Sequence, residues 1–177
     1  IAAGFGLAQF TRHSRTLGPA PGLGNAGLMA ANLTDVHTGR LSKVLTTSPN
    51  GSETETLSTV NSLANLVAPC ARHQGRCARL FRAAKVPGEK IPQGALDAIA
   101  MIARNPWHNV AGLFRLSRKG PEPYSPALAS TDQPSAWTVA LRFDGDGKTM
   151  NGPGNFAVDA KGNLWVVNNY NYSPDPF

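Results

Sequence analysis

The sequence has few charged residues and little negative charge. Charged side chains make up 16% of the 177 residues, with 17 Lys plus Arg against 11 Asp plus Glu and a formal net charge of +6. This balance favours anionic surroundings without naming a partner. No apolar run approaches the roughly 18–20 residues of a membrane helix, so we expect no membrane span. The opening stretch IAAGFGLAQF is apolar but lacks a basic leader, so we expect a chain already processed or a true start further upstream.

The sequence also lacks any constellation that predicts catalysis or a cofactor. The four histidines stand alone, without the spacing of metal ligands. Nothing in the order of Ser, His and Asp residues indicates a triad. Asp144 and Asp146 are spaced like the first ligands of a calcium loop, but the later oxygen ligands and the closing Glu are missing. We therefore predict no catalytic residue, no metal site and no cofactor, and we do not expect an enzyme.

Cysteine is scarce: the chain has only Cys70 and Cys77, in the stretch PCARHQGRCARLF. Six residues separate them, a span that lets the chain turn back so that the two sulfurs can meet. A zinc site would need two more soft ligands. We favour a disulfide over free thiols, and a disulfide in turn indicates an oxidising compartment.

Glycine and proline are abundant, at 18 and 14 residues, so we expect a loop-rich chain with long connections. For residues 1–50 we predict an extended, loop-rich N-terminal segment with short helices over residues 1–13 and 25–36. The intervening RTLGPAPGLGN predicts an extended linker because its prolines and glycines disfavour a helix. In the second helix the predicted buried stripe consists of Leu28, Met29, Ala31 and Leu33.

Residues 51–120 predict a helical domain. Ser52 and Glu55 have the spacing of a capping box, which places the start of a helix at Ser52, and Pro69 predicts its end. Apolar residues recur every three or four positions along its core face: Leu57, Val60, Leu63, Ala64 and Val67.

Three more helices complete the predicted domain. They cover Cys77–Ala84, Gly94–Arg104 and a stretch to Ser117 that opens with Asn105 as the cap and Pro106 as the first helical residue. Their predicted buried residues are, in order, Leu80 and Phe81; Leu96, Ile99, Ala100 and Ala103; and Val110, Leu113, Phe114 and Trp107.

Residues 121–177 change to a β-pattern, so we predict an α+β fold. WTVALRF, residues 137–143, alternates as a strand does, and residues 152–172 predict two strands joined by a tight turn. A two-stranded hairpin alone is marginal in water, so something should cover it. The candidates are the 137–143 strand, a continuation of the protein, or an edge strand of a neighbouring subunit. The predicted partner-binding residues are Trp165, Tyr170, Tyr172 and Phe177.

The hairpin GPGNFAVDAKGNLWVVNN resembles the opening of an NHL-type β-propeller blade, which has an apolar-x-apolar-Asp stretch, a Gly-Asn turn and an apolar strand beginning with Trp or Tyr. The helical stretches TLSTVNSLANLVAPCARHQGRCARLFRAA and ALDAIAMIARNPWHNVAGLFRL are similar to the segment that precedes the propeller in secreted bacterial NHL-repeat proteins, in which the two cysteines recur in similar places. The resemblance covers residues 56–177, and residues 1–55 match only loosely. The matching hairpin positions are Pro153, Val158, Asp159, Gly162, Asn163, Leu164, Trp165 and Val166.

This resemblance implies an exported protein, secreted or periplasmic, in which a small helical domain with one disulfide leads into a partial propeller blade. The first functional hypothesis is a non-enzymatic assembly or binding module, packed against other protein chains or a continuation of the same protein. The alternative is the N-terminal piece of a propeller enzyme of streptogramin-lyase type. None of the residues that such an enzyme would use for chemistry maps onto this sequence.

Four arginines recur at intervals of three or four residues around the cysteines and support a weaker alternative, a polyanion-binding protein. No nucleic-acid fold signature is present, so we favour an ordinary solvated face and do not expect a nucleic-acid partner. The possible anion-binding residues are Arg72, Arg76, Arg79 and Arg82.

Overall fold

The computed structural model describes residues 1–13, 15–72, 77–145 and 152–168. Within these ranges the fold mixes α-helices with two small antiparallel sheets, and the predicted α+β class is confirmed at this level. In chain order the elements are α1 (Ala2–Gly6), the 3₁₀ turn η1 (Ala8–Phe10), β1 (Thr11–Arg12), β2 (Arg15–Thr16), α2 (Ala20–Leu33), α3 (Lys43–Thr46), α4 (Thr56–Arg72), α5 (Cys77–Ala84), α6 (Ala95–Arg104), α7 (Val110–Ser117), β3 (Pro153–Val158) and β4 (Leu164–Asn168).

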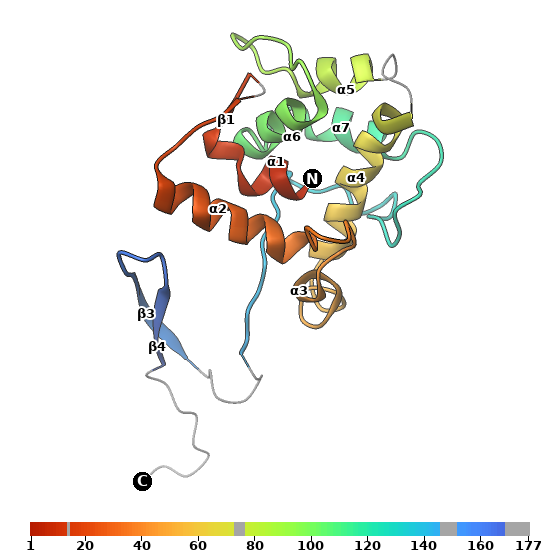
Figure 1. Cartoon of the computed structure of the whole chain (residues 1–177). Helices are drawn as coiled ribbons and strands as arrows, with labels where there is room; N and C mark the ends of the chain where they lie inside the picture. The colour runs from red at the N-terminus through yellow and green to blue at the C-terminus, as the bar shows by residue number, and fades with distance from the viewer. Residues whose placement is uncertain (14, 73–76, 146–151, 169–177) are drawn as a thin grey trace.

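The helices pack into one body with α6 at its centre (Figure 1). Six consecutive residues of α6, Asp97 to Ile102, are buried, so this helix is covered on nearly all sides. It contacts α1 and α5, and it shares the main apolar cluster with α4 and α7. A second, smaller cluster joins Leu33, Leu45 and Val60, and Phe5 packs against both clusters. The core is therefore assembled from segments spread over residues 1–139.

Glycine lets α1 lie against two helices at once. A Cβ on Gly4 would overlap the side chain of Ile99 in α6, and a Cβ on Gly6 would overlap the backbone carbonyl of Ala26 in α2. Because only glycine permits such close backbone approach, α1 fits between α2 and α6 and connects them.

The helix α2 starts earlier than predicted. The expected linker RTLGPAPGLGN contains its first turns, since α2 begins at Ala20 with Pro19 as its N-cap. Proline is tolerated in the first turn because the backbone N–H groups there have no helical partner. The predicted buried stripe is also partly wrong, because Leu28 is exposed and the buried positions are Ala26, Ala30 and Leu33.

The start of α4 departs from the capping-box prediction. The helix begins at Thr56, and residues 48–53 form turns in which the N–H of Glu53 bonds the carbonyl of Pro49. Ser52 therefore caps no helix. Pro69 does not end α4 either, because the helix continues to Arg72 with the proline inside it. The loss of one backbone hydrogen bond is tolerated near the end of this long, packed helix.

The start of α7 also differs from the prediction. Asn105 ends α6, with its N–H directed at the carbonyls of Met101 and Ile102, and α7 begins only at Val110. Trp107 lies in the intervening turn and is 76% exposed, so it does not contribute to the predicted buried face. By contrast, the predicted bounds of α5 are confirmed.

Buried polar side chains of α4 hold the long loop that follows α7. The amide of Asn65 both donates to the carbonyl of Tyr124 and accepts from its N–H, at 3.0 and 3.1 Å. Asn61 donates to the carbonyl of Pro126, and the hydroxyl of Ser62 accepts from the N–H of Leu128. These side chains satisfy backbone donors and acceptors of the loop, as a neighbouring strand would in a sheet.

The predicted strand over residues 137–143 is not formed. Trp137 is completely buried in the main cluster, and its backbone N–H donates to the carbonyl of Pro106. Further along, Thr56 donates to the carbonyl of Ala140 at 2.7 Å, and the Asn50 amide pairs with both backbone groups of Arg142 at 2.8 and 2.9 Å. Because side chains of the helical body already occupy these backbone groups, this segment does not cover the hairpin.

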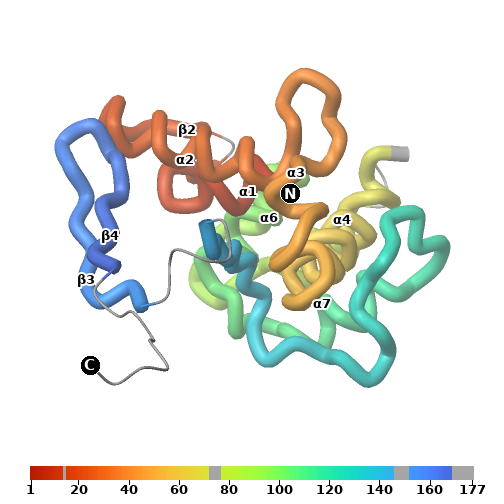
Figure 2. Tube along the Cα trace, turned by 90° about the horizontal axis from the view of Figure 1, so that it is seen from below, coloured from red at the N-terminus to blue at the C-terminus, as the bar shows by residue number. Residues whose placement is uncertain are grey.

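The hairpin β3–β4 lies beside the helical body, below α2 in Figure 1 and next to one end of α2 in Figure 2. Its two strands pair with each other in an antiparallel sheet, as predicted. The turn approaches α2 at one point, since a Cβ on Gly162 would overlap the side chain of Asn25. Gly162 also has φ +85°, a conformation that favours glycine.

Candidate interaction surface

The hairpin turn is organised by the carboxylate of Asp159. One oxygen accepts the backbone N–H groups of Lys161 and Asn163, at 2.8 and 2.9 Å. The other accepts the side-chain amide of Asn163 at 2.9 Å and the indole N–H of Trp165 at 3.1 Å. The side-chain bond from Asn163, followed by those from Trp165 and the backbone, lowers the pKa of Asp159 to about 2. The turn is therefore held by its own side chains, without help from a neighbour.

The strand register gives the hairpin two apolar faces. Phe156 pairs with Val166 and Val158 pairs with Leu164, so these four side chains share one face. On the other face Ala157 pairs with Trp165, and Val167 lies two residues further along the strand. A sheet with one solvated face alternates apolar and polar residues, whereas apolar residues on both faces are typical of a strand covered on both sides.

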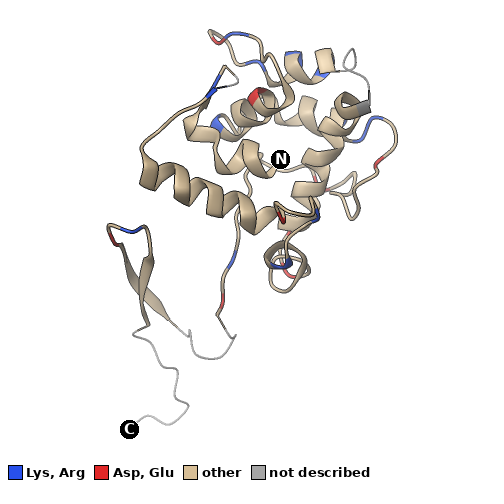
Figure 3. Ribbon diagram, viewed as in Figure 1, with Lys and Arg blue, Asp and Glu red and all other residues tan. Residues whose placement is uncertain are grey.

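These apolar side chains are exposed. The five large ones retain between 53% and 74% of their accessible surface: Phe156, Val158, Leu164, Trp165 and Val167. Figure 3 shows charged residues at the turn but none along the two strands. Large contiguous apolar patches on a protein surface are typical of interaction sites. The hairpin is the candidate interaction surface of this chain.

The outer edges of the hairpin carry no described neighbour strand. Within the ranges that the structure describes, β3 and β4 form a sheet of two strands, and the other sheet, β1–β2, is separate. An edge strand presents backbone donors and acceptors that can pair with another chain. The surface therefore offers two kinds of contact, apolar packing on its faces and hydrogen bonding along its edges.

Of the four predicted partner-binding residues, the structure places Trp165 on this surface. Tyr170, Tyr172 and Phe177 lie outside the described residues. Sequence reasoning did not assign Phe156, Val158, Leu164 and Val167 to the site. The signal that could have identified them is the lack of a polar position on either face of β4 before Asn168.

No protein-family model matches the chain, and neither a curated protein nor a solved structure matches it. The likeness to NHL-type propellers therefore stays a prediction. So do export and the three-part division of the chain.

The predicted disulfide is absent from the structure, in which Cys70 and Cys77 are both free thiols. The chain does bring them together, as the spacing suggests, since a side-chain hydrogen bond links them. Burial, followed by this hydrogen bond and the charge interaction with Cys77, raises the pKa of Cys70 to about 12. A buried thiol with a raised pKa is chemically inert rather than reactive.

The predicted anion-binding arginines are only partly placed. Arg79 and Arg82 are exposed on α5, whereas Arg76 and the side chain of Arg72 lie outside what the structure describes. Among the described residues, no group of three or more His, Cys, Asp or Glu side chains could hold a metal ion. A search of the same residues finds no helix whose length and hydropathy suit a membrane crossing.

Proposed function

We propose that this chain is a non-enzymatic, exported assembly module whose hairpin completes a β-sheet with other polypeptide. That polypeptide is a continuation of the same protein or a separate subunit. The resemblance of residues 152–168 to the first strands of an NHL-type blade supports a propeller as the sheet in question. In that arrangement the helical body is a cap that precedes the blades.

The observation that carries this proposal is the exposure of apolar side chains on both faces of one preformed hairpin. Full burial of a large apolar side chain stabilises by about 1.5–3 kcal/mol relative to exposure. Burial of five such side chains would contribute a large favourable free energy, and sheets packed on both faces of the hairpin would bury most of their surface. Propeller blades cover each other face to face in this way, which the resemblance implies for this chain too.

The turn chemistry supports a binding role over a role in the body's own core. Asp159 makes four hydrogen bonds within the hairpin, three that fix the turn and one that holds the indole N–H of Trp165. A hairpin that is already shaped before its partner arrives loses less conformational entropy on binding. Trp165 is then a rigid aromatic anchor of the kind enriched at interfaces.

The proposal is tested by measuring the intact mass of the native protein and the hydrogen exchange of β3 and β4 in that material. We expect either a polypeptide that continues past Phe177 or a stable complex with another chain, and slow exchange at the outer edges of both strands. A monomer that ends at Phe177 and exchanges rapidly along both strands would overturn the proposal.

A pair of charge substitutions locates the contact. Phe156→Lys and Val158→Lys introduce a cation on one hairpin face, and we expect both to abolish the association measured by sedimentation. Leu28→Lys is the matched control, because Leu28 is equally apolar and 68% exposed but lies on α2. Equal loss of association in all three variants would place the contact elsewhere.

A further inference from the structure

A cavity of about 540 Å³ lies on the opposite side of the helical body from the hairpin. It is formed where the C-terminal part of α4, the helix α5 and the residues that follow α7 meet. Its apolar lining includes Leu66 and Leu80, which are both buried, and the half-buried Leu116. This volume lies within the range of small-molecule pockets, about 300–1,000 Å³.

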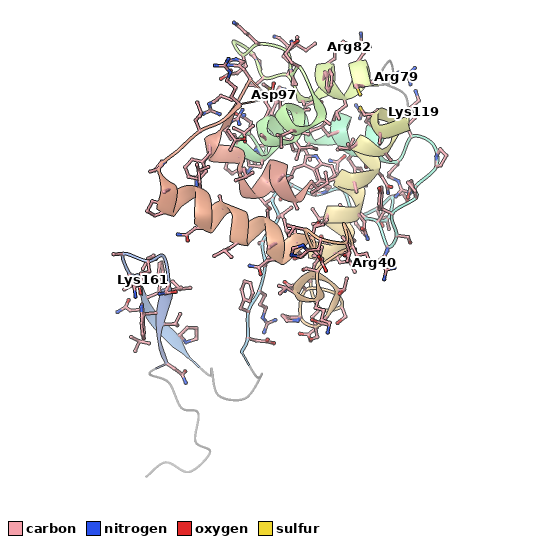
Figure 4. The ribbon with its side chains drawn as sticks, in the orientation of Figure 1. Arg40, Arg79, Arg82, Asp97, Lys119 and Lys161 are labelled. Carbon is pink, nitrogen blue, oxygen red and sulfur yellow. The ribbon has the colours of Figure 1, made fainter. Side chains whose placement is uncertain are left out.

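Every charged side chain that lines this cavity is a cation. Arg79 and Arg82 come from α5 and Lys119 follows α7, and Figure 4 shows all three at this end of the body. In the described part of the chain the one ion pair is formed by Arg142 and Glu53, so these three cations have no acidic partner there. The four residues that link α4 to α5 in the sequence read HQGR and include no acid.

We propose that this cavity binds a small amphipathic anion, a molecule with one carboxylate on an apolar body. The leucines receive the apolar part, and the cations receive the carboxylate at the rim. The three cations have no acidic partner among the described residues, and a bound carboxylate forms charge-assisted hydrogen bonds with them. The lining contains no aromatic side chain for base stacking, which argues against a nucleic-acid strand. This proposal does not depend on the hairpin.

The probe is decanoate, measured by calorimetry on the full chain below its micelle concentration. We expect one saturable site for decanoate, with methyl NMR shifts at Leu66, Leu80 and Leu116. Decyltrimethylammonium has the same apolar body with the opposite charge, and acetate has the head without the body, so neither should bind there. Absence of saturable decanoate binding, or shifts confined to the hairpin, would overturn the proposal.

Charge-removing variants assign the head-group contact. Arg79→Gln, Arg82→Gln and Lys119→Gln should each weaken decanoate binding by roughly 2- to 5-fold, a range typical of exposed charge contacts. Arg40→Gln is the matched control, since it lowers the net charge equally but lies at another end of the body (Figure 4). Equal weakening by Arg40→Gln would mean that net charge alone explains the loss of affinity, and it would contradict the proposal.

A blocking variant tests the place of the apolar body. Ala78 lines the cavity but is exposed on α5, so Ala78→Trp can fill the space without disturbing the core. We expect loss of decanoate binding with an unchanged unfolding midpoint. Unchanged decanoate affinity in this variant would show that the ligand sits elsewhere.

Discussion

The helical body and the hairpin use the same kind of residue in opposite ways, and two tryptophans show it. Trp137 follows a proline-rich loop and is completely buried in the main apolar cluster, whereas Trp165 lies in the apolar strand β4 and stays 66% exposed. Both residues sit in apolar sequence that predicts a strand. The difference is that segments from many parts of the chain converge on Trp137, while the hairpin contacts little besides itself. An apolar pattern alone therefore does not bury a side chain, because burial also needs neighbouring segments to pack against it.

The largest expected effect separates the two tryptophans directly. Trp137→Ala should lower the free energy of unfolding by about 3–5 kcal/mol, because it leaves a cavity in the packed core. Trp165→Ala should change it by less than about 0.5 kcal/mol, as is usual at exposed positions. Chemical denaturation followed by far-ultraviolet circular dichroism measures both. Similar losses in the two variants would mean that the hairpin is part of the cooperative core.

A smaller effect is expected where the helical body holds the 137–143 segment. Asn50 is buried and its amide bonds the carbonyls of Val44 and Arg142 and the N–H of Arg142. Asn50→Ala should therefore destabilise by about 2–3 kcal/mol, since it leaves buried backbone groups without partners. Thr56→Val removes a single bond and should cost about 1 kcal/mol. If Asn50→Ala is neutral in the same denaturation assay, that segment is not anchored by this side chain.

Acid should break the hydrogen bonds that Asp159 makes in the hairpin turn. The pKa of Asp159 is lowered to about 2 in the folded state, so its contribution is complete above its ordinary pKa and is lost as the pH falls from about 4 toward 2. We expect the indole N–H resonance of Trp165 to move across this range. The indole resonance of Trp137 is the internal control, and Asp159→Asn should remove the pH dependence. A Trp165 resonance that is constant to pH 2 would contradict the hydrogen bond.

The smallest effect concerns chemical labelling and leaves stability unchanged. At pH 8 iodoacetamide should modify Cys77, which is partly exposed, and spare Cys70, which is buried with its pKa raised to about 12. Peptide mass mapping measures the ratio, and the unfolded protein, in which both thiols react, is the reference. Protection of both cysteines until a reductant is added would show that they pair after all.

Sequence reasoning was most successful where local pattern is strong. The bounds of α5 and the antiparallel pairing of the two hairpin strands were predicted from local sequence alone. It failed where tertiary contacts compete with local signals. Ser52 and Asn105 look like helix caps, yet one lies in a turn and the other ends the preceding helix.

Two other features could not be predicted from the sequence because they are formed by segments far apart along the chain. The polar face of α4, with Asn61 and Asn65, reads as a solvated surface, but it is buried under a loop some 60 residues further along. The cationic cavity needs Lys119 beside α5, and no spacing in the sequence places it there. The candidate surface on the hairpin was predicted in outline, since Trp165 was identified but its apolar neighbours were not.

The anchoring of Arg142 limits how far the hairpin can travel. Covalent geometry allows at most roughly 33–36 Å between Arg142 and Gly152, ten residues later. Such a short tether keeps the hairpin at a high effective concentration near the body, so a sheet that receives it must also sit within that radius. Any larger architecture built on this chain therefore inherits a fixed maximum distance between the helical body and the β3–β4 hairpin.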